Sequence, residues 1–348
     1  MELERDGLLD ELLETPGVSG YESRCQRVWI DHVTGRVDAV ETDPYDNAVA
    51  RVDGDGSTTV AVTSHIDAVG YVVRRIDDRG YLHVGGVGAV DGVCARGQRV
   101  TVHAADDDVT GVVVHTPTEM RDWSATQLTD PTELRIDIGA HDRADARTRV
   151  AVGDPVTIAA EPATLANGRI AARCHDNRIG AYVVAEVVRH AAVTTTETTV
   201  LGVSTVQEEI GRRGAEMVTA EYDVDAVIVV DAAIATDAPA APTAVGNEIT
   251  LGGGPVVARG GGNHQRLVTA ARSAADSIDR SIQLQATPVG TGTDADVFAA
   301  ACGPVPTLHL GFPTRNLHTP VEVVDRSDVE TTVELLAELL STIGADGL

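Results

Sequence analysis

Residues 199–209 read TVLGVSTVQEE, an almost unbroken apolar run that ends in two adjacent glutamates. A strand buried on one face alternates apolar and polar side chains, whereas a strand covered on both faces is apolar throughout. Three further runs of this kind occur, at residues 59–63, 225–230 and 306–310. Together the four runs predict a mostly parallel sheet that is covered on both faces.

Helix-like spacing of apolar residues occurs between or after the later runs, at residues 179–190, 265–277 and 329–343. Strands that alternate with helices indicate a layered α/β domain. Between about 73 and 164 the helical spacing disappears, and short Val-rich segments are punctuated by Gly and Asp. We therefore expect residues 1–72 and 165–348 to form the α/β domain and residues 73–164 to form an inserted β domain.

Charge excludes several classes of partner. The chain has 53 acidic and 27 basic residues, a formal net charge of −26, and its basic residues include no Lys. Binding to nucleic acid or to an anionic membrane requires clustered cations, so we expect neither partner. A Lys-free acidic surface suits concentrated salt, where charge repulsion is screened, and predicts a halophilic origin. The charged first residues and the lack of a long apolar run predict a cytoplasmic protein.

Each apolar run is followed within a few residues by potential metal ligands: His65, the pair Glu208-Glu209, Asp231 and His318. The carboxyl ends of parallel strands meet in one crevice, so these side chains can converge. Asp176, just before the expected helix at 179–190, can join them. Crowded carboxylates repel one another unless cations neutralise them, which two divalent ions would do. Nitrogen and oxygen ligands suit zinc, cobalt or manganese, and the four scattered cysteines do not indicate a thiolate site.

Each candidate, taken alone, also has a simpler explanation. Glu208 and Glu209 could begin an acidic helix, because carboxylates favour helix N-termini. Asp176 could be the N-cap of the helix that follows it. His65 could be a loop residue capped by Asp67. The occurrence of all these residues, in order, at strand ends favours a metal site.

Several motifs together resemble the TET-type, or tetrahedral, metalloaminopeptidases, which include glutamyl and deblocking aminopeptidases. The resemblance covers nearly the whole chain and is carried by SHIDAVG (64–70), DNRIG (176–180), TVQEEIGRRGA (205–215), VDAAIATD (230–237), GTDA (292–295) and PTRNLHTPVEV (313–323). It implies a zinc-peptidase-like catalytic domain with an inserted small β-barrel or PDZ-like domain. It also implies a homo-oligomer in which dimers build a dodecamer through the inserted domain.

The resemblance also implies a role for each candidate. Two divalent metals per subunit would share Asp176 as a bridging ligand, and the remaining ligands would be His65 and Asp231 on one metal and Glu209 and His318 on the other. Glu208 would be the general base, and Asp67 would orient His65. A cis peptide bond is expected after Asp176.

These roles describe a metal-dependent aminopeptidase that removes N-terminal residues from short peptides. The residues alone leave two alternatives open, a related di-metal carboxypeptidase or deacylase and a non-catalytic metal-binding scaffold. Glu208 argues against the scaffold, because a pure binding site needs no unligated carboxylate beside a ligand. Asn316, Thr319 and residues 232–234 depart from the family pattern, so the sequence does not predict which N-terminal residue is preferred.

Overall fold

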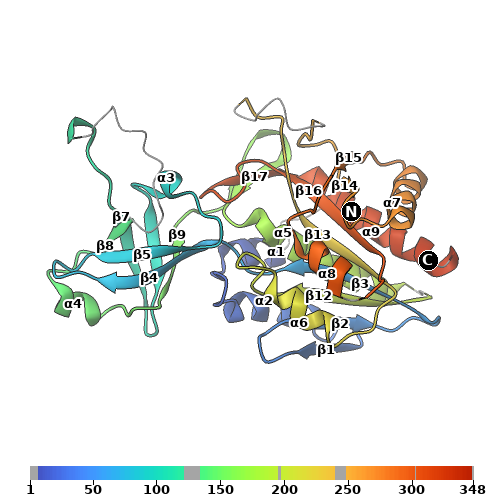
Figure 1. Ribbon diagram of the computed structural model, residues 1–348, viewed down its shortest axis with the longest axis horizontal. Coiled ribbons are helices and arrows are strands. Elements are labelled where there is room, and N and C mark those ends of the chain that lie inside the picture. The colour runs from blue at the N-terminus through green and yellow to red at the C-terminus, as the bar shows by residue number, and fades with distance from the viewer. Residues whose placement is uncertain (1–6, 121–133, 195–196, 240–247, 302, 347–348) are drawn as a thin grey trace.

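The computed structural model describes residues 7–120, 134–194, 197–239, 248–301 and 303–346. Two parts are visible in Figure 1, a larger part around an eight-stranded sheet and a smaller closed barrel. The barrel strands follow the third strand of the chain, so the barrel interrupts the larger part in sequence. This mixed α/β fold with a small barrel confirms the fold class expected from the sequence.

The central sheet contains all four apolar runs. In spatial order its strands are β1 (Ala39–Thr42), β2 (Ala48–Val52), β12 (Thr198–Thr205), β3 (Thr58–His65), β13 (Ala226–Ile234), β16 (Thr307–Thr314), β14 (Val256–Arg259) and β15 (Gln283–Ala286). β12, β3, β13 and β16 are mutually parallel. β2 and β14 pair antiparallel with the two outer strands of this group. The carboxyl ends of four parallel strands therefore lie at one edge of the sheet.

Helices cover both faces of the sheet. One face packs against α1 (Gly7–Glu14), α2 (Ser23–Val33), α5 (His175–Val193), α7 (Gln265–Ser277) and α9 (Arg326–Asp346), and the other against α6 (Arg213–Thr219) and α8 (Asp294–Ala301). Within the described ranges, every helix is too short or too polar to span a lipid bilayer.

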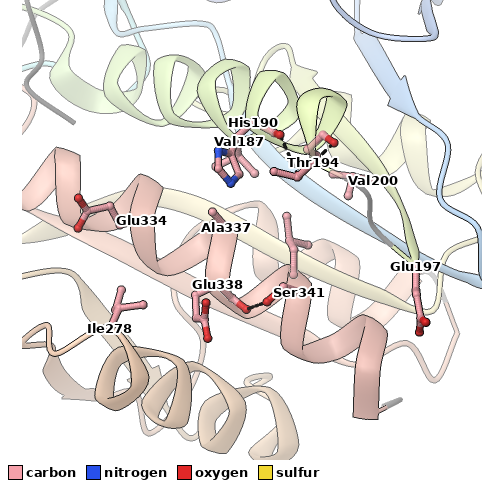
Figure 2. A pocket seen from close by; sticks show the side chains of 12 residues that line it. Val187, His190, Thr194, Glu197, Val200, Ile278, Glu334, Ala337, Glu338 and Ser341 are labelled. Atoms are coloured by element: carbon pink, nitrogen blue, oxygen red, sulfur yellow. Dashed lines mark hydrogen bonds between the residues drawn. The ribbon is translucent and has the colours of Figure 1, made fainter.

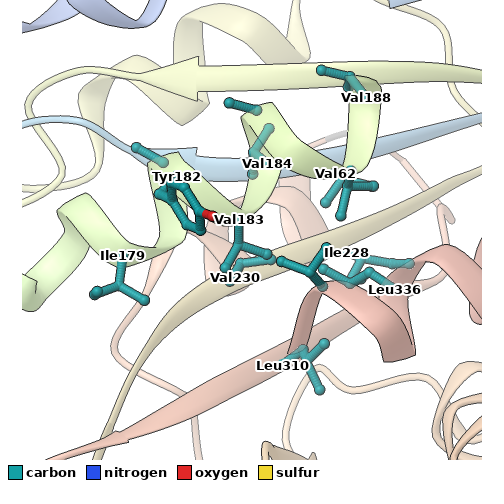
Figure 3. Close-up of a cluster of buried hydrophobic side chains, with 14 of the residues drawn as sticks. Val62, Ile179, Tyr182, Val183, Val184, Val188, Ile228, Val230, Leu310 and Leu336 are labelled. Atoms are coloured by element: carbon teal, nitrogen blue, oxygen red, sulfur yellow. The ribbon is translucent and has the colours of Figure 1, made fainter. Parts of the chain in front are cut away.

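Strand β13 shows why the runs are apolar throughout. Ile228 and Val230 belong to the core under α5 and α9, whereas Val227 and Val229 belong to the core under α6 and α8. Figure 3 shows Ile228 and Val230 facing Val183 of α5. Successive side chains on a strand point to opposite faces, so two covered faces require apolar residues at every position.

The barrel closes in the order β4 (Gly70–Ile76), β5 (Leu82–Val87), β8 (Arg135–Asp137), β7 (Asp108–Val113), β6 (Arg99–His103) and β9 (Pro155–Ile158). Its interior is mostly aliphatic, with Val84, Val100 and Ile136 among its residues, and also contains Tyr71. This part of the chain also contains the short helices α3 (Gly92–Ala95) and α4 (Arg143–Arg147) and the 3-10 turn η1 (Thr118–Met120). α3 and α4 are too short to produce helical periodicity in the sequence, and each is capped by an Asp side chain, that of Asp91 or Asp142.

A small antiparallel sheet joins two segments that are distant in sequence. It contains β10 (Ala163–Thr164), β11 (Arg169–Ala172) and β17 (Glu322–Asp325), with the 3-10 turn η3 (Ala166–Gly168) before β11. β11 leads into α5, which begins beside Asp176, and β17 follows the segment that carries His318. Ala172 pairs with Glu322 across this sheet, so Asp176 and His318 are brought to the same place.

Candidate metal centre

The structure brings together the five predicted ligands. His65 is the last residue of β3, and Asp231 lies in the second half of β13. Glu209 follows the end of β12, and His318 follows β16. Asp176 lies in the first turn of α5, where the Asp176–Asn177 peptide bond is cis, as the resemblance implies.

The five side chains form two groups that share one carboxylate. His65 Nε2 lies 3.2 Å from Asp176 Oδ1 and 3.5 Å from Asp231 Oδ1. His318 Nε2 lies 3.2 Å from Asp176 Oδ2 and 3.4 Å from Glu209 Oε2. Within each group of three residues, the candidate ligand atoms all lie within 4.8 Å of one another. Asp176 thus presents one oxygen to each group.

The donor set fits divalent cations. Glu209 Oε1 is buried and accepts no hydrogen bond within the described part of the chain, and Asp176 Oδ1, also buried, has the His65 imidazole at 3.2 Å but no hydrogen bond of good geometry. A buried carboxylate oxygen without a donor is costly, and a cation would satisfy it. All ligand atoms are oxygen or imidazole nitrogen, and the three described cysteines, Cys25, Cys94 and Cys174, are free. Such a set suits zinc, cobalt or manganese.

The buried carboxyl groups of the site favour the binding of positive charge. Burial and the nearby Asp176 carboxylate raise the pKa of Glu209 to about 7, although contact with His318 opposes the shift. Burial likewise raises the pKa of Asp231 to about 7. Burial opposes protonation of His318, but its contacts with Asp176 and Glu209 prevail and raise the pKa of His318 to about 11. Protons therefore occupy this cluster when nothing else neutralises it.

Glu208 and Asp67 stand beside the two groups. Burial raises the pKa of the Glu208 carboxyl to about 9, with the negative charges of Asp231 and Glu209 acting in the same direction. Asp67 Oδ1 lies 3.4 Å from His65 Nδ1, but the backbone carbonyl of Asp67 is closer to that nitrogen, at 3.1 Å. The Asp67 carboxylate also accepts the backbone N–H groups of Glu208 and Glu209, at 3.0 and 3.1 Å. Asp67 thus contacts both the imidazole and the loop that carries the two glutamates.

Sequence reasoning did not single out Glu322. This carboxylate is 2% exposed and accepts the backbone N–H groups of Asp176 and His318, at 3.0 and 2.8 Å. It therefore fixes two candidate ligands through their backbones. An acidic residue inside the apolar segment 321–324 was the available signal.

Asp294, in the GTDA motif, was also given no role by the sequence. It is fully buried, and Thr205 Oγ1 donates a hydrogen bond of 2.7 Å to its Oδ2. Burial raises the pKa of Asp294 to about 6. Thr205 pairs with His65 of the neighbouring strand, so the Asp294 carboxyl lies beside the candidate centre.

A cavity of considerable size lies away from the candidate ligands. The cavity drawn in Figure 2 has a volume of about 460 Å³ and lies between the end of α5, around His190, and α9, around Glu334 and Glu338. Asp176 is at the opposite end of α5. Size alone therefore does not locate the convergent acids and imidazoles.

Comparisons with known proteins show which chains this one resembles. The sequence profile of the M42 glutamyl aminopeptidase family matches residues 46–335. The lysyl aminopeptidase of Pyrococcus furiosus is 30% identical over 341 residues, which cover 97% of this chain and 96% of that protein.

Two solved structures share the fold over nearly their whole length. The TET aminopeptidase of the marine sediment archaeon Thaumarchaeota archaeon SCGC AB-539-E09 superposes with a TM-score of 0.89 at 28% identity, over 96% of this chain and 95% of that chain. The TET1 peptidase of Pyrococcus horikoshii superposes with a TM-score of 0.86 at 26% identity, over 96% of this chain and 98% of that chain.

Proposed function

Because the chain belongs to the M42 glutamyl aminopeptidase family and is a metal-dependent aminopeptidase, we propose that the strand-end cluster is its active site. The observation that carries this proposal is the sharing of Asp176 by two groups of candidate ligands. Two divalent ions would be held, one by His65 and Asp231, the other by Glu209 and His318, with Asp176 between them. Zinc, cobalt and manganese all suit these ligands.

Glu208 is the proposed general base. When bound, divalent ions supply Lewis-acid activation of water and of the peptide carbonyl. Glu208 belongs to neither group of candidate ligands, so its carboxylate is available for protons. It takes a proton from the attacking water and returns it to the departing amine. Asp67 holds His65 and the Glu208 loop in place during this transfer.

The acidic surroundings also explain a preference for chain ends. Carboxylates beside the two groups that are not candidate ligands, such as that of Glu208, stay negative when cations are bound and can attract the free α-ammonium group of a peptide, whereas an internal peptide nitrogen carries no charge. We therefore propose short peptides with free N-termini as substrates.

A substrate panel tests this function. Amino-acid p-nitroanilides and short peptides, free or N-acetylated, would be incubated with zinc, cobalt or manganese in high salt. Release of N-terminal amino acids from the free peptides alone supports the proposal. Release from C-termini or from N-acetylated substrates would identify the alternative carboxypeptidase or deacylase, and metal binding without hydrolysis would identify a scaffold.

Assembly and environment are further parts of the proposal. The Pyrococcus horikoshii relative can assemble into a tetrahedron or a large octahedral shell. We propose that residues 73–164 act as the inserted oligomerisation domain of this chain, with residues 1–72 and 165–348 as the catalytic domain, and that dimers build a dodecamer. Light scattering should then give twelve times the chain mass of 36.4 kDa.

Salt dependence tests the halophilic origin that we propose from the net charge of −26. Activity and secondary structure should be lost as salt falls from about 3 M to about 0.1 M, because self-repulsion is then less screened. Indifference to salt over this range would contradict the proposal. The cytoplasmic location stays a prediction.

A further inference from the structure

The loop that carries Glu208 and Glu209 is held by side chains from other segments. Four consecutive backbone N–H groups beyond β12 each donate to such a side chain. The donors and acceptors are Val206 to Asn47 Oδ1 (2.9 Å), Gln207 to Glu22 Oε1 (3.2 Å), Glu208 to Asp67 Oδ1 (3.0 Å) and Glu209 to Asp67 Oδ2 (3.1 Å). Beyond Thr205 the chain leaves the sheet, so these acceptors replace the strand partners that the backbone has lost.

Two of these acceptors depend on the turn between α1 and α2. Ser19 Oγ donates a hydrogen bond of 2.6 Å to Asp67 Oδ2, the oxygen that accepts the N–H of Glu209. Glu22 Oε1 also accepts the N–H of Gly20, at 2.6 Å, so the turn fixes its own carboxylate. Ser19 and Glu22 are 3% and 5% exposed, so water does not compete for these bonds.

The turn is itself fastened to the segment after β3. The Ser19 N–H donates to the carbonyl of Ala68 at 3.2 Å, and the Ala68 N–H donates to the carbonyl of Gly17 at 3.0 Å. In α2, Gln26 exchanges two side-chain hydrogen bonds with Ser204 of β12. The turn, the Asp67 segment and the end of β12 therefore form one connected unit.

The loop that this unit holds contains a residue in an unfavourable backbone conformation. Gln207 has φ of 57°, in the left-handed region that residues with a Cβ rarely adopt. Its N–H is the one accepted by Glu22. A residue in this conformation redirects the chain, and here it does so immediately before Glu208 and Glu209.

We propose that Ser19 and Glu22 are positioning residues for the aminopeptidase reaction. From the turn between α1 and α2 they form a clamp that holds residues 206–209. The clamp sets the direction of the Glu208 and Glu209 carboxylates. The clamp means here the side chains of Ser19 and Glu22 together with the Asp67 and Gln207 groups that they bind. This inference rests on the proposed roles of Glu208 and Glu209. Neither Ser19 nor Glu22 belongs to the two groups of candidate metal ligands, so both act through the loop.

The test compares Ser19→Ala and Glu22→Ala with matched variants. Ser23→Ala is the control for Ser19, because Ser23 also donates a 2.6 Å bond to an Asp, Asp46, but at an exposed position outside the clamp. Glu22→Gln is the conservative variant for Glu22, since its amide oxygen can still accept the Gln207 N–H. Burial and the charge of Asp67 raise the pKa of Glu22 to about 7, so a neutral side chain is compatible with this position.

Turnover and the cobalt spectrum are the first readouts. We expect Ser19→Ala and Glu22→Ala to lower kcat by about 10-fold to 100-fold, as displacement of a catalytic group does, with KM within about threefold. The visible spectrum of the cobalt-loaded protein should change in the same variants, because Glu209 is displaced. Ser23→Ala and Glu22→Gln should stay close to the unaltered protein in both measurements.

Amide hydrogen exchange at residues 206–209 separates this inference from the proposed function. Faster exchange in Ser19→Ala, but not in Ser23→Ala, supports the clamp. This conclusion holds even if cobalt does not bind to the unaltered protein. Failure of the unaltered protein to bind cobalt would count against the metal site and not against the clamp. Unchanged exchange, kcat and cobalt spectrum in Ser19→Ala, with only a lower melting temperature, would overturn the clamp. If Glu22→Ala does not fold, Ser19→Ala decides the question.

Discussion

Two regions at opposite ends of α5 contain similar residue types but differ in how those residues are held. At the start of the helix, Asp176 is 8% exposed and contacts two imidazoles at 3.2 Å. At its end, the cavity of Figure 2 is bordered by glutamates with ordinary partners: Glu334 pairs with Arg280 at 2.7 Å, and Glu338 accepts from Ser277 at 2.8 Å. The reactivity that we propose for the start of α5 would come from shared, buried and incompletely satisfied carboxylates, and neither composition nor cavity size would provide it.

Removing the shared carboxylate should have the largest effect. Asp176→Ala deletes a ligand of both proposed ions, so metal content should fall from about two ions per chain to almost none and hydrolysis should be lost. His318→Ala deletes a ligand of one group and should leave about one ion per chain. Elemental analysis of dialysed protein measures both. Equal metal loss in the two variants would show that Asp176 is not shared.

Removing the base should have the next largest effect. Glu208→Gln keeps the size of the side chain but cannot accept the proton, so turnover should fall by about 10²-fold to 10⁴-fold while metal content stays unchanged. Glu338→Gln, at the cavity, is the matched control and should keep its turnover. Hydrolysis of amino-acid p-nitroanilides provides the rates. Turnover near that of the unaltered protein in Glu208→Gln would exclude this residue as the base.

Metal removal should act on stability in a pH-dependent way. In the metal-free protein burial raises the pKa of Glu208 to about 9 and those of Glu209 and Asp231 to about 7, so the folded state binds protons more tightly than the unfolded chain. Its stability must then fall as pH rises from about 5 to about 9. The raised pKa of His318, about 11, acts in the same direction. Bound cations replace these protons, so the metal-loaded protein lacks this loss.

The melting temperatures of metal-loaded and chelator-treated protein should therefore diverge as pH rises. Metal at 100 times its Kd contributes about 2.7 kcal/mol, which corresponds to a difference of several degrees. Scanning calorimetry at constant salt measures the difference, and Asp176→Ala is the control in which metal should have little effect. A difference that narrows towards pH 9 would contradict the proposed ligands.

The sequence predicted the position of those site residues that directly follow a strand. His65 and Asp231 follow the apolar runs at residues 59–63 and 225–230 within two residues, and parallel pairing then places such residues at one edge of the sheet. The resemblance added the pairing of ligands, which no spacing in the chain reveals. Both kinds of inference concern residues whose side chains face the site.

Residues that act through the backbone could not be found in this way. Glu322 and Glu22 accept N–H groups from segments 146 and 185 residues away in sequence, and no periodicity records such contacts. Asp67 was expected to orient His65, but its bonds to the Glu208 and Glu209 N–H groups depend on the left-handed turn at Gln207. One-turn helices such as α3 are likewise determined by a capping Asp, which leaves no repeating pattern.

Filling the cavity at the far end of α5 should have the smallest effect. Ala337 lies on α9 within the cavity lining, which also includes the apolar side chains of Val187, Val200 and Ile278. Ala337→Leu adds apolar surface that these side chains can cover, and Leu is a good helix former, so stability should rise by about 0.5–2 kcal/mol. Because no candidate ligand lines the cavity, kcat/KM should stay within about twofold of that of the unaltered protein. Denaturant unfolding measures the stability, and p-nitroanilide assays measure kcat/KM. A tenfold change in kcat/KM would show that the two ends of α5 are coupled, and the contrast between a reactive end and an inert one would then fail.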